Sequence, residues 1–557
     1  MMQVERGHAA RFQKIEWIPL KDVIFWKLSK RYLLPAFPIL GRVSLESSMP
    51  LSSLAPAVPL VAAAIALLRP GRCPKPIPVI AEAAALAAFA LCLAGAVQFA
   101  FKGVGDGGPL VRLDVVNTLV APVVAFIGWV VTRYGRTYLD GAAREGRFHA
   151  LMLTALGLVL LQVQAGSLAL LVPALAAIGL VLRQLLLFFP DRAPARRAAA
   201  KFTLVWGAGD AALILATGLL WLAYGTLDIA TIEVAARLAP LPPAAEGAIG
   251  MLVLAALLKT AAFPLHGWLT EVMEAPTPVS ALLHAGIINS GGLLLIRLAW
   301  LVQASPAAMA ALVLLGGFTA LFGALVMLTQ SAVKTALAWS TVAQMGFMLL
   351  QCGLGLWPLA MLHILAHSLY KAHAFLSSGG AIRAVQATRR PGPVAAPGVG
   401  AVVRAFGLAL ALYGLTAVGF TLLAGPKSPQ ALALGLILVS GVAYLVAQGL
   451  ADAAPRALTQ RTLIASTAVT LSYFGLQALA VHAAGGTLPA PPVAGALEWA
   501  LIGLTVTSFC VVAVAQALFP HWAHHPAAAG LRVHIANGFY LNAAFDRLIG
   551  GFRAIRS

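Results

Sequence analysis

Long apolar runs dominate the chain, and each is about twenty residues, enough to cross a hydrocarbon layer of ~30 Å. Backbone groups in lipid must bond within their own segment, and the runs are too continuous for barrel strands, so each is predicted to be a helix. The pattern predicts an all-α polytopic membrane protein with about fifteen transmembrane helices. The predicted spans lie at 51–68, 77–101, 115–133, 148–164, 167–189, 202–224, 247–269, 276–300, 306–328, 333–352, 357–380, 401–424, 429–450, 461–482 and 494–519.

Composition agrees with this pattern. The 557 residues are 60% hydrophobic and 10% charged, whereas roughly a quarter of an ordinary soluble protein is charged. A soluble globular enzyme is therefore excluded. The net charge of +19 is explained by basic loops that orient helices, so no nucleic-acid partner is expected. The cysteines contain no CxxC pair, which supports neither a disulfide framework nor a cysteine zinc site; they are Cys73, Cys92, Cys352 and Cys510.

Loop charge predicts the orientation of the bundle. Basic clusters such as Arg192 with Arg196 follow odd-numbered spans, while Asp228 and Glu233 follow span 6. Odd loops and the C-terminus are therefore expected in the cytoplasm. Residues 1–48 contradict this, because they carry eight basic residues and would be translocated without a signal peptide. Since Met49 resembles a natural start, we expect residues 1–48 to be either an over-extension or a membrane-surface segment.

Candidate chemistry begins in span 7, MLVLAALLKTAAFPLHGWL, which contains Lys259 and Pro264. A charge at the centre of a membrane costs about 2.5 to 3.5 kcal/mol on insertion scales. Proline removes a helix hydrogen bond, so Pro264 is expected to break the helix beside the lysine. The lysine is either a group that exchanges protons or a snorkelling or ion-paired residue that holds helices together.

Histidines in spans 8 and 11 add to this candidate site. His284 lies in EAPTPVSALLHAGIINSGG, while His363, His367 and Lys371 are spaced at i, i+4 and i+8. Steps of four predict one winding stripe about 12 Å long, with His373 facing elsewhere. Imidazoles give and take protons near neutral pH, which favours a proton relay. The alternative is a polar interface that only joins helices. A metal site is not expected, because carboxylate and thiolate ligands are missing from the stripe.

Several other polar residues have two readings each. Asp210, in GAGDAALILA, either supports Lys259 or forms an ordinary ion pair. Lys334, at the start of span 10, either joins the relay or snorkels. Glu271 and Glu274 are expected to be solvated helix-start charges between spans 7 and 8. A surface cluster after span 15 is not expected to bind zinc; it comprises His521, His524 and His525.

Three segments carry a family resemblance: LLKTAAFPLHGWLTEVMEAPTPVSALLHAGIINSGG, VKTALAWSTVAQMGFMLL and HILAHSLYKAHAFL. Over about 200–380 the chain resembles the antiporter-like subunits of respiratory complex I and of Mrp cation/proton antiporters. The resemblance implies two inverted five-helix repeats with broken helices, the second break in span 12 near Gly419, Gly425 and Pro426. It carries a proton-relay role to Lys259, His284, Lys334, His363, His367 and Lys371, with Asp210 as a supporting acid.

The resemblance also implies a division of the chain. The expected parts are an extension at 1–48, helices 1–3 at 49–146, a first repeat at 147–303, a second repeat at 304–452, and C-terminal helices with an amphipathic tail at 453–557. Spans 4–8 should superpose on spans 9–13 about an axis in the membrane plane, because consecutive five-span units are inverted.

Two departures from that family matter. Leu175 stands where span 5 carries the family's glutamate, and Lys427 is only a weak candidate for the second-repeat lysine. The short ending and the HAGIINSGG segment look most like the DabB family, membrane subunits of bacterial inorganic carbon transporters. That resemblance implies a bacterial inner-membrane subunit that conducts H+ or Na+ without a cofactor of its own, and a cytoplasmic, zinc-containing, DabA-like partner with carbonic-anhydrase-like chemistry. The alternatives are an antiporter or complex I pump module, and a non-conducting membrane anchor.

Overall fold

The computed structural model describes residues 50–73, 76–103, 105–106, 110–380, 398–449 and 456–548. The expected extension at 1–48 and the basic residues Arg383, Arg389 and Arg390 lie outside the described residues. Helices make up nearly all of the described part, so the all-α prediction is confirmed. A short antiparallel pair, β1 (Gly105–Asp106) with β2 (Arg112–Leu113), joins the second and third predicted spans.

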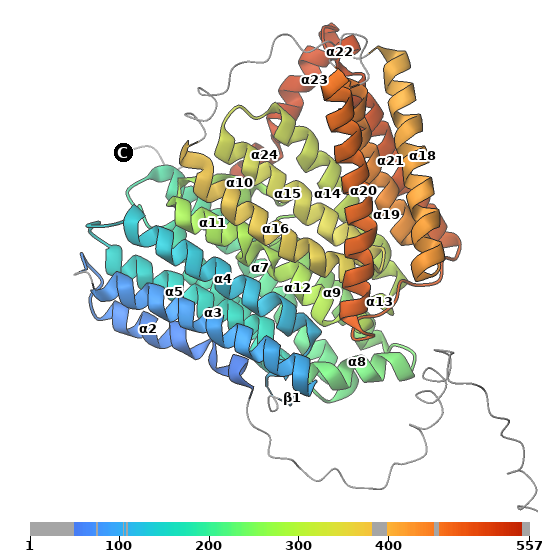
Figure 1. Cartoon of the computed structure of the whole chain (residues 1–557). Coiled ribbons are helices and arrows are strands. Elements are labelled where there is room, and N and C mark those ends of the chain that lie inside the picture. The colour runs from blue at the N-terminus through green and yellow to red at the C-terminus, as the bar shows by residue number, and fades with distance from the viewer. Residues whose placement is uncertain are drawn as a thin grey trace, which may run out of the picture. The chain divides into compact units, whose positions relative to one another are not determined.

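The first part of the chain forms a helix over each predicted span (Figure 1), but α7 begins earlier than the predicted span 6, and α8 lies in the predicted loop after it. Asp114 caps the third long helix by accepting a hydrogen bond from the Asn117 N–H, and Ser167 caps the helix of span 5 in the same way, as short polar side chains do. The elements are η1 (Leu51–Leu54), α2 (Ala57–Leu67), α3 (Pro76–Lys102), α4 (Val115–Tyr138), α5 (Glu145–Gln164), α6 (Leu168–Leu186), α7 (Ala193–Tyr224) and α8 (Ile229–Leu238).

Span 7 is broken, as Pro264 predicts. Helix α9 (Pro243–Lys259) ends at the lysine, Ala261 has a positive φ of 53°, and α10 (Gly267–Glu271) resumes the helix. Proline supplies no N–H for a continuous helix. Span 8 is also interrupted, since Gly286 separates two helical pieces. Its elements are η2 (Val272–Glu274), α11 (Thr277–Ala285), η3 (Ile287–Asn289), α12 (Ser290–Arg297) and α13 (Ala299–Gln303).

The expectation of a second helix break within span 12 is wrong. Helix α18 (Val399–Ala424) runs through Gly419, and Gly425, with φ 84°, follows its end. A glycine inside a helix keeps its backbone hydrogen bonds, unlike a proline, and Pro426 lies beyond the helix. The other elements are α14 (Pro306–Thr329), α15 (Val333–Gly353), α16 (Trp357–Ser377), η4 (Ser378–Gly380), α19 (Pro429–Gly449), α20 (Arg456–Ala484), α21 (Ala496–Ala517), α22 (Phe519–Trp522), α23 (Pro526–Ala536), η5 (Gly538–Tyr540) and α24 (Leu541–Leu548).

Ten helices in the described part of the chain are long and apolar enough to cross a membrane. The protein is therefore a multi-pass membrane protein. Helix α9 is not among these ten helices, because the break limits it to 17 residues. Helices α15 and α16 are not among them either, because their polar residues lower their mean hydropathy. The total of fifteen spans, the domain boundaries and the symmetry axis stay predictions.

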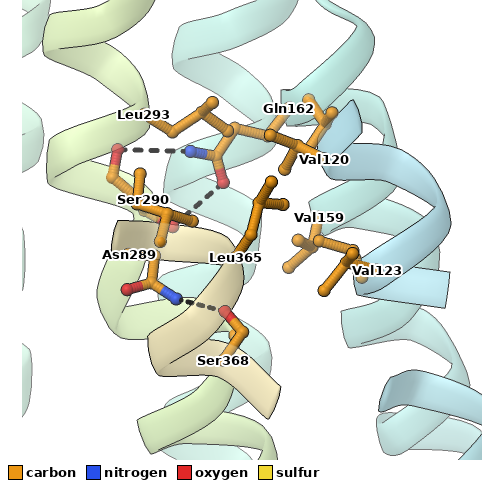
Figure 2. Close-up of a pocket in the computed structure, with 13 residues that line it drawn as sticks. Val120, Val123, Val159, Gln162, Asn289, Ser290, Leu293, Leu365 and Ser368 are labelled. Atoms are coloured by element: carbon orange, nitrogen blue, oxygen red, sulfur yellow. Dashed lines mark hydrogen bonds between the residues drawn. The ribbon is translucent and has the colours of Figure 1, made fainter. Parts of the chain in front are cut away.

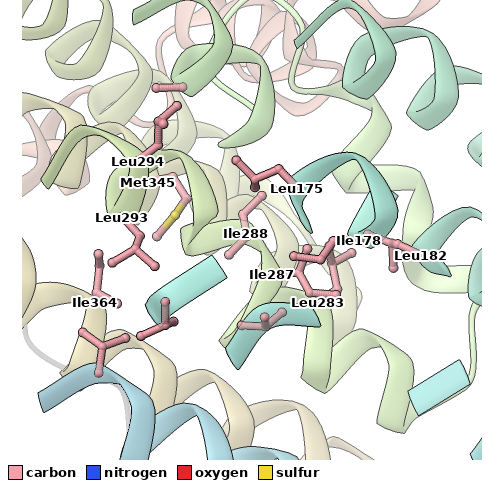
Figure 3. Packing of buried hydrophobic residues seen from close by; sticks show 14 of the residues in the cluster. Leu175, Ile178, Leu182, Leu283, Ile287, Ile288, Leu293, Leu294, Met345 and Ile364 are labelled. Carbon is pink, nitrogen blue, oxygen red and sulfur yellow. The ribbon is translucent and has the colours of Figure 1, made fainter. Parts of the chain in front are cut away.

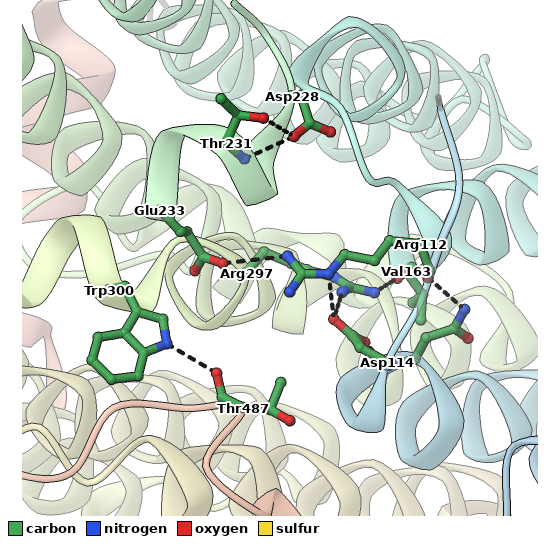
Figure 4. A network of polar contacts seen from close by, with 10 residues as sticks. Arg112, Asp114, Val163, Asp228, Thr231, Glu233, Arg297, Trp300 and Thr487 are labelled. Carbon is green, nitrogen blue, oxygen red and sulfur yellow. Dashed lines mark hydrogen bonds and ion pairs between the residues drawn. The ribbon is translucent and has the colours of Figure 1, made fainter. Parts of the chain in front are cut away.

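Contacts between loops distinguish the two ends of the bundle. At one end, Arg112 after span 2 pairs with Glu233 after span 6 at 3.3 Å, and Trp300 Nε1 donates to the Thr487 carbonyl at 2.9 Å (Figure 4). Burial raises the pKa of the Glu233 carboxyl to about 7, against the opposing effect of Arg112. At the other end, Gln330 after span 9 donates to the Ala536 carbonyl of the tail. These pairings agree with alternating spans, and which end is cytoplasmic stays a prediction.

The buried core joins the broken helices to their neighbours. Leu175, Leu283, Ile288 and Met345 meet in one cluster contributed by α6, α11, η3 and α15 (Figure 3). Helices α14 and α15 approach closely, because a Cβ added at Gly346 would lie 2.4 Å from the Ala320 backbone nitrogen. Small residues allow such backbone contact between membrane helices. The helices that carry the polar residues are thus held in a tightly packed core.

Candidate functional site

Lys259 and Asp210 form an ion pair at the break in span 7. Lys259 is fully buried at the end of α9, and its Nζ donates to Asp210 Oδ1 of α7 at 2.6 Å. The ammonium also lies 4.1 Å from the ring centroid of Trp206, a favourable cation–π contact. Trp206 and Asp210 are four residues apart, so they share one face of α7. The structure thus brings together the two groups that the sequence singled out here.

An uncharged residue, Leu175, occupies the position at which the family carries a glutamate in span 5. Leu175 is fully buried in α6, and the Trp206 indole N–H donates to its carbonyl at 3.4 Å. The indole ring therefore lies between α6 and Lys259, and the carboxylate comes from α7 instead. Sequence reasoning missed Trp206, because an aromatic residue in a membrane span is usually a packing residue.

A second polar group joins α11, α15 and α16. His284 is fully buried; its Nδ1 lies 3.0 Å from Thr341 Oγ1, and its ring stacks on Phe375 with centroids 4.4 Å apart. His367 Nε2 lies 3.1 Å from the His284 carbonyl oxygen. Lys371 is fully buried and donates to the Leu337 carbonyl at 3.0 Å. The stripe on α16 thus faces α11 and α15.

His363 continues this group along α16. Its Nδ1 lies 2.9 Å from Gln351 Oε1, and its ring centroid lies 5.9 Å from that of His367. Both histidines line an open pocket of about 580 Å³, together with Phe347, Gln351 and Tyr370. This end of the stripe is therefore open, whereas Lys371 at the other end is fully buried.

The remaining predicted residues lie apart from these two groups. Lys334 donates to Thr277 Oγ1 at 3.0 Å, which joins the start of α15 to the start of α11. Lys427 is partly buried in the loop between α18 and α19, so it joins neither group. His373 is exposed, as its position off the stripe predicts.

Amide side chains border the stripe on its other side. Asn289 donates to Ser368 Oγ at 2.9 Å, and Ser290 donates to Gln162 Oε1 at 3.0 Å (Figure 2). These residues line an enclosed cavity of about 20 Å³, room for a water molecule. They join α5, α12 and α16 next to the histidine group.

A buried cluster at the tail end was not expected. Lys201 of α7 is fully buried; it contacts Glu271 of α10 and lies 2.5 Å from Asp546 of α24. Asn542 of α24 accepts from Lys201 at 2.7 Å and donates to Glu271 at 2.7 Å. The expectation that Glu271 is solvated is therefore wrong, since its side chain is 16% exposed. No sequence signal links residues so far apart in the chain.

His266 is a further buried residue that the sequence reading missed. It lies in the broken segment, is 1% exposed, and its ring is 4.9 Å from that of Trp339 on α15. Its position two residues after Pro264 is the sequence signal that could have placed His266 in the broken segment.

Comparison with known proteins gives a consistent assignment. The profile of the family described as "NADH:quinone oxidoreductase/Mrp antiporter, TM" matches residues 165–425. The chain is 36% identical over 486 residues to "Probable inorganic carbon transporter subunit DabB2" of Halothiobacillus neapolitanus, covering 83% of this chain and 86% of the relative. It is 42% identical over 306 residues to the corresponding DabB subunit of Hydrogenovibrio crunogenus, covering 55% of this chain and 59% of the relative.

A solved structure shares the fold. The Mrp complex from Dietzia sp. DQ12-45-1b superposes with a TM-score of 0.56 at 22% identity, covering 91% of this chain and 60% of that one. The predicted antiporter-like fold class is thereby confirmed. By its sequence relatives, the chain belongs to the DabB family of inorganic carbon transporter subunits.

Proposed function

We propose that this chain is the cation-conducting membrane subunit of a complex that accumulates inorganic carbon. Protons or sodium ions moving down their gradient through Lys259 and the α16 stripe would drive CO2 hydration or bicarbonate accumulation by a DabA-like partner. The observation that carries this proposal is Lys371, a fully buried lysine whose hydrogen bond goes to a carbonyl.

Lys371 is poorly explained as a structural residue. A buried ammonium without a counter-ion is costly, whereas a structural lysine is paired. Lys201 is such a paired residue, with Glu271 and Asp546 beside it. Within the described residues, Lys371 has no carboxylate within ion-pair distance and lies beside two histidines, His284 and His367. This arrangement favours a group that changes its proton over one that only joins helices.

The Lys259–Asp210 ion pair is the second charged group of the proposed pathway, in addition to Lys371 and its neighbouring histidines. Its ammonium and carboxylate lie 2.6 Å apart at a helix break, where the interrupted backbone leaves the lysine free to change partners. Asp210 therefore takes the role that the family gives to the span 5 glutamate.

Coupling to carbon chemistry requires contact with a partner. CO2 crosses bilayers unaided, so its accumulation must be linked to a downhill process. The tail end of the bundle carries exposed aromatic residues, with Phe539 50% and Tyr540 45% exposed, next to the exposed Arg547. We assign the zinc-dependent chemistry to the partner and the docking surface to this end, which we orient toward the cytoplasm of a bacterial inner membrane.

A free-standing cation/proton antiporter is the second candidate. The Mrp-like fold and the matching family profile favour it. An antiporter would exchange Na+ for H+ in vesicles that contain this chain alone, whereas the proposed subunit requires the partner for bicarbonate accumulation.

The test uses vesicles that contain the full chain and its partner. Lys371→Met should abolish cation flux and bicarbonate accumulation while the protein stays in the membrane at wild-type abundance. His373→Ala is the matched control, because it alters an exposed residue of the same helix. An uncoupler or a sodium ionophore should collapse accumulation and so identify the coupling ion. Accumulation that survives loss of both gradients, or normal flux in Lys371→Met, would disprove the proposal.

A further inference from the structure

The hydrogen-bond partners of the buried histidines determine where each neutral ring carries its hydrogen. A neutral imidazole has one N–H donor and one nitrogen acceptor. In a file that passes protons, the acceptor nitrogen is the atom that receives one. Identifying the acceptor nitrogen of each ring therefore shows at which atom each histidine of the relay receives a proton.

Thr341 fixes the hydrogen of His284. The Thr341 hydroxyl donates to the Leu337 carbonyl at 3.0 Å, so its single hydrogen is already used. With the hydroxyl hydrogen on the Leu337 carbonyl, the 3.0 Å contact between Thr341 Oγ1 and His284 Nδ1 is donated by the ring. His284 accordingly carries its hydrogen on Nδ1. Its Nε2 is a free acceptor, and within the described residues this buried nitrogen has no partner.

The main chain fixes the hydrogen of His367. A carbonyl oxygen can only accept, so the 3.1 Å contact between His367 Nε2 and the His284 carbonyl is donated by the ring. The free acceptor of His367 is therefore Nδ1. The amide oxygen of Gln351 acts on His363 in the same way and leaves Nε2 as its acceptor.

Lys371 and Thr341 donate hydrogen bonds to the same acceptor, the Leu337 carbonyl. The Leu337 carbonyl receives both the Lys371 ammonium and the Thr341 hydroxyl, each at 3.0 Å. Leu337 also lies inside α15, where its carbonyl accepts from the main-chain N–H four residues later, so three donors meet at this oxygen. The Thr341 hydroxyl thus contacts both the Leu337 carbonyl, which also accepts from Lys371, and the His284 ring.

We propose that Thr341 is a positioning residue that holds His284 as the Nδ1–H form, so that His284 receives protons at Nε2. This inference rests on the proposed relay role of His284. Without the hydroxyl, the ring loses the acceptor that favours this form, and the hydrogen moves to Nε2 in part of the molecules. The nitrogen that should accept is then blocked.

Three variants separate this role from packing. Thr341→Val keeps the shape but removes the hydroxyl, and Thr341→Ser keeps the hydroxyl. Thr132→Val is the matched control, because Thr132 is also buried and its hydroxyl donates to the Gly128 carbonyl four residues earlier. Per molecule in the membrane, we expect cation flux to fall about tenfold in Thr341→Val, the change that accompanies loss of one buried hydrogen bond. Thr341→Ser and Thr132→Val should retain wild-type flux.

A spectroscopic measurement is independent of transport. Solid-state NMR of the wild-type chain with ¹⁵N-labelled histidine should assign the His284 hydrogen to Nδ1, with His284→Ala identifying the signal. The Thr341→Val spectrum should contain the Nε2–H form. A wild-type ring with its hydrogen on Nε2, or normal flux in Thr341→Val when His284→Ala is inactive, would overturn the inference alone. Normal flux in His284→Ala would instead overturn the relay role itself.

Discussion

Replacing Lys201 by methionine tests the cluster that holds α24 in place. Lys201 contacts Glu271 and Asp546, whose side chains are 16% and 10% exposed, and donates to Asn542. Removing one partner of a buried ion pair costs about 3 to 5 kcal/mol. Because both carboxylates keep some contact with solvent, we take the lower limit of about 3 kcal/mol, roughly a hundredfold in equilibrium.

That loss should fall mainly on α24. The helix has eight residues, too few to be stable alone, so it stays in place only through its contacts. Asp546 has Lys201 as its cation in the described structure, whereas Glu271 also has Arg197 at 3.7 Å. In Lys201→Met we therefore expect α24 to leave the bundle while the rest of the protein stays folded.

Hydrogen–deuterium exchange of the purified chain in nanodiscs measures this directly. Amides of residues 541–548 should exchange about a hundredfold faster in Lys201→Met. Arg197→Met is the control, because its contact with Glu271 is longer and its side chain is 45% exposed, so its loss costs at most about 1 kcal/mol. Unchanged exchange at 541–548 in Lys201→Met would refute the reasoning.

Three further predictions concern the relay, the Arg112–Glu233 ion pair and helix packing. Lys259→Ala and His363→Ala should each abolish transport-dependent growth in air-level CO2 at normal membrane abundance, as immunoblots of membranes would verify. Glu233 has a folded-state pKa raised to about 7 from 4.5, so the folded chain binds more protons between those values and its Tm should fall as pH rises through them; Glu233→Gln should flatten this dependence. Gly346→Ala should lower the Tm, because its Cβ would meet the α14 backbone at 2.4 Å, an overpacking cost of about 1 to 3 kcal/mol.

The relay and packing predictions each have an internal control. His373→Ala should grow normally, since the residue is exposed. Gly414→Ala should leave the Tm unchanged or slightly higher, because nothing lies within 4 Å of its Cβ. Growth of both relay variants, an identical pH dependence in Glu233→Gln, or an unchanged Tm in Gly346→Ala would contradict the corresponding argument.

The sequence predicts features that depend on one helix at a time. Apolar run length predicts the spans, Pro264 predicts the break beside Lys259, and the spacing of four predicts that His363, His367 and Lys371 share a face. Each follows from local backbone geometry. The error at Gly419 is local too, because glycine permits a break but does not require one.

Contacts between helices could not be predicted in this way. Thr341 and Gln351 read as ordinary polar residues of an amphipathic span, and Trp206 reads as packing. Their roles depend on which helix lies opposite, which hydropathy along one segment does not specify. Asn542 lies 341 residues from Lys201, a distance at which no local pattern carries information.

The same separation has a consequence for biogenesis. Chains are made from the N-terminus at about 5 to 20 residues per second, so α24 emerges roughly 20 to 70 s after Lys201. During that interval α7 is already in the membrane, and the half-helix α10 lacks the tail that holds it. Assembly of the broken span is therefore completed only after α24 has been made. Ribosomes that stop before α24 would release chains in which Lys201 and Glu271 lack their α24 partners, a recognisable defect for membrane quality-control proteases.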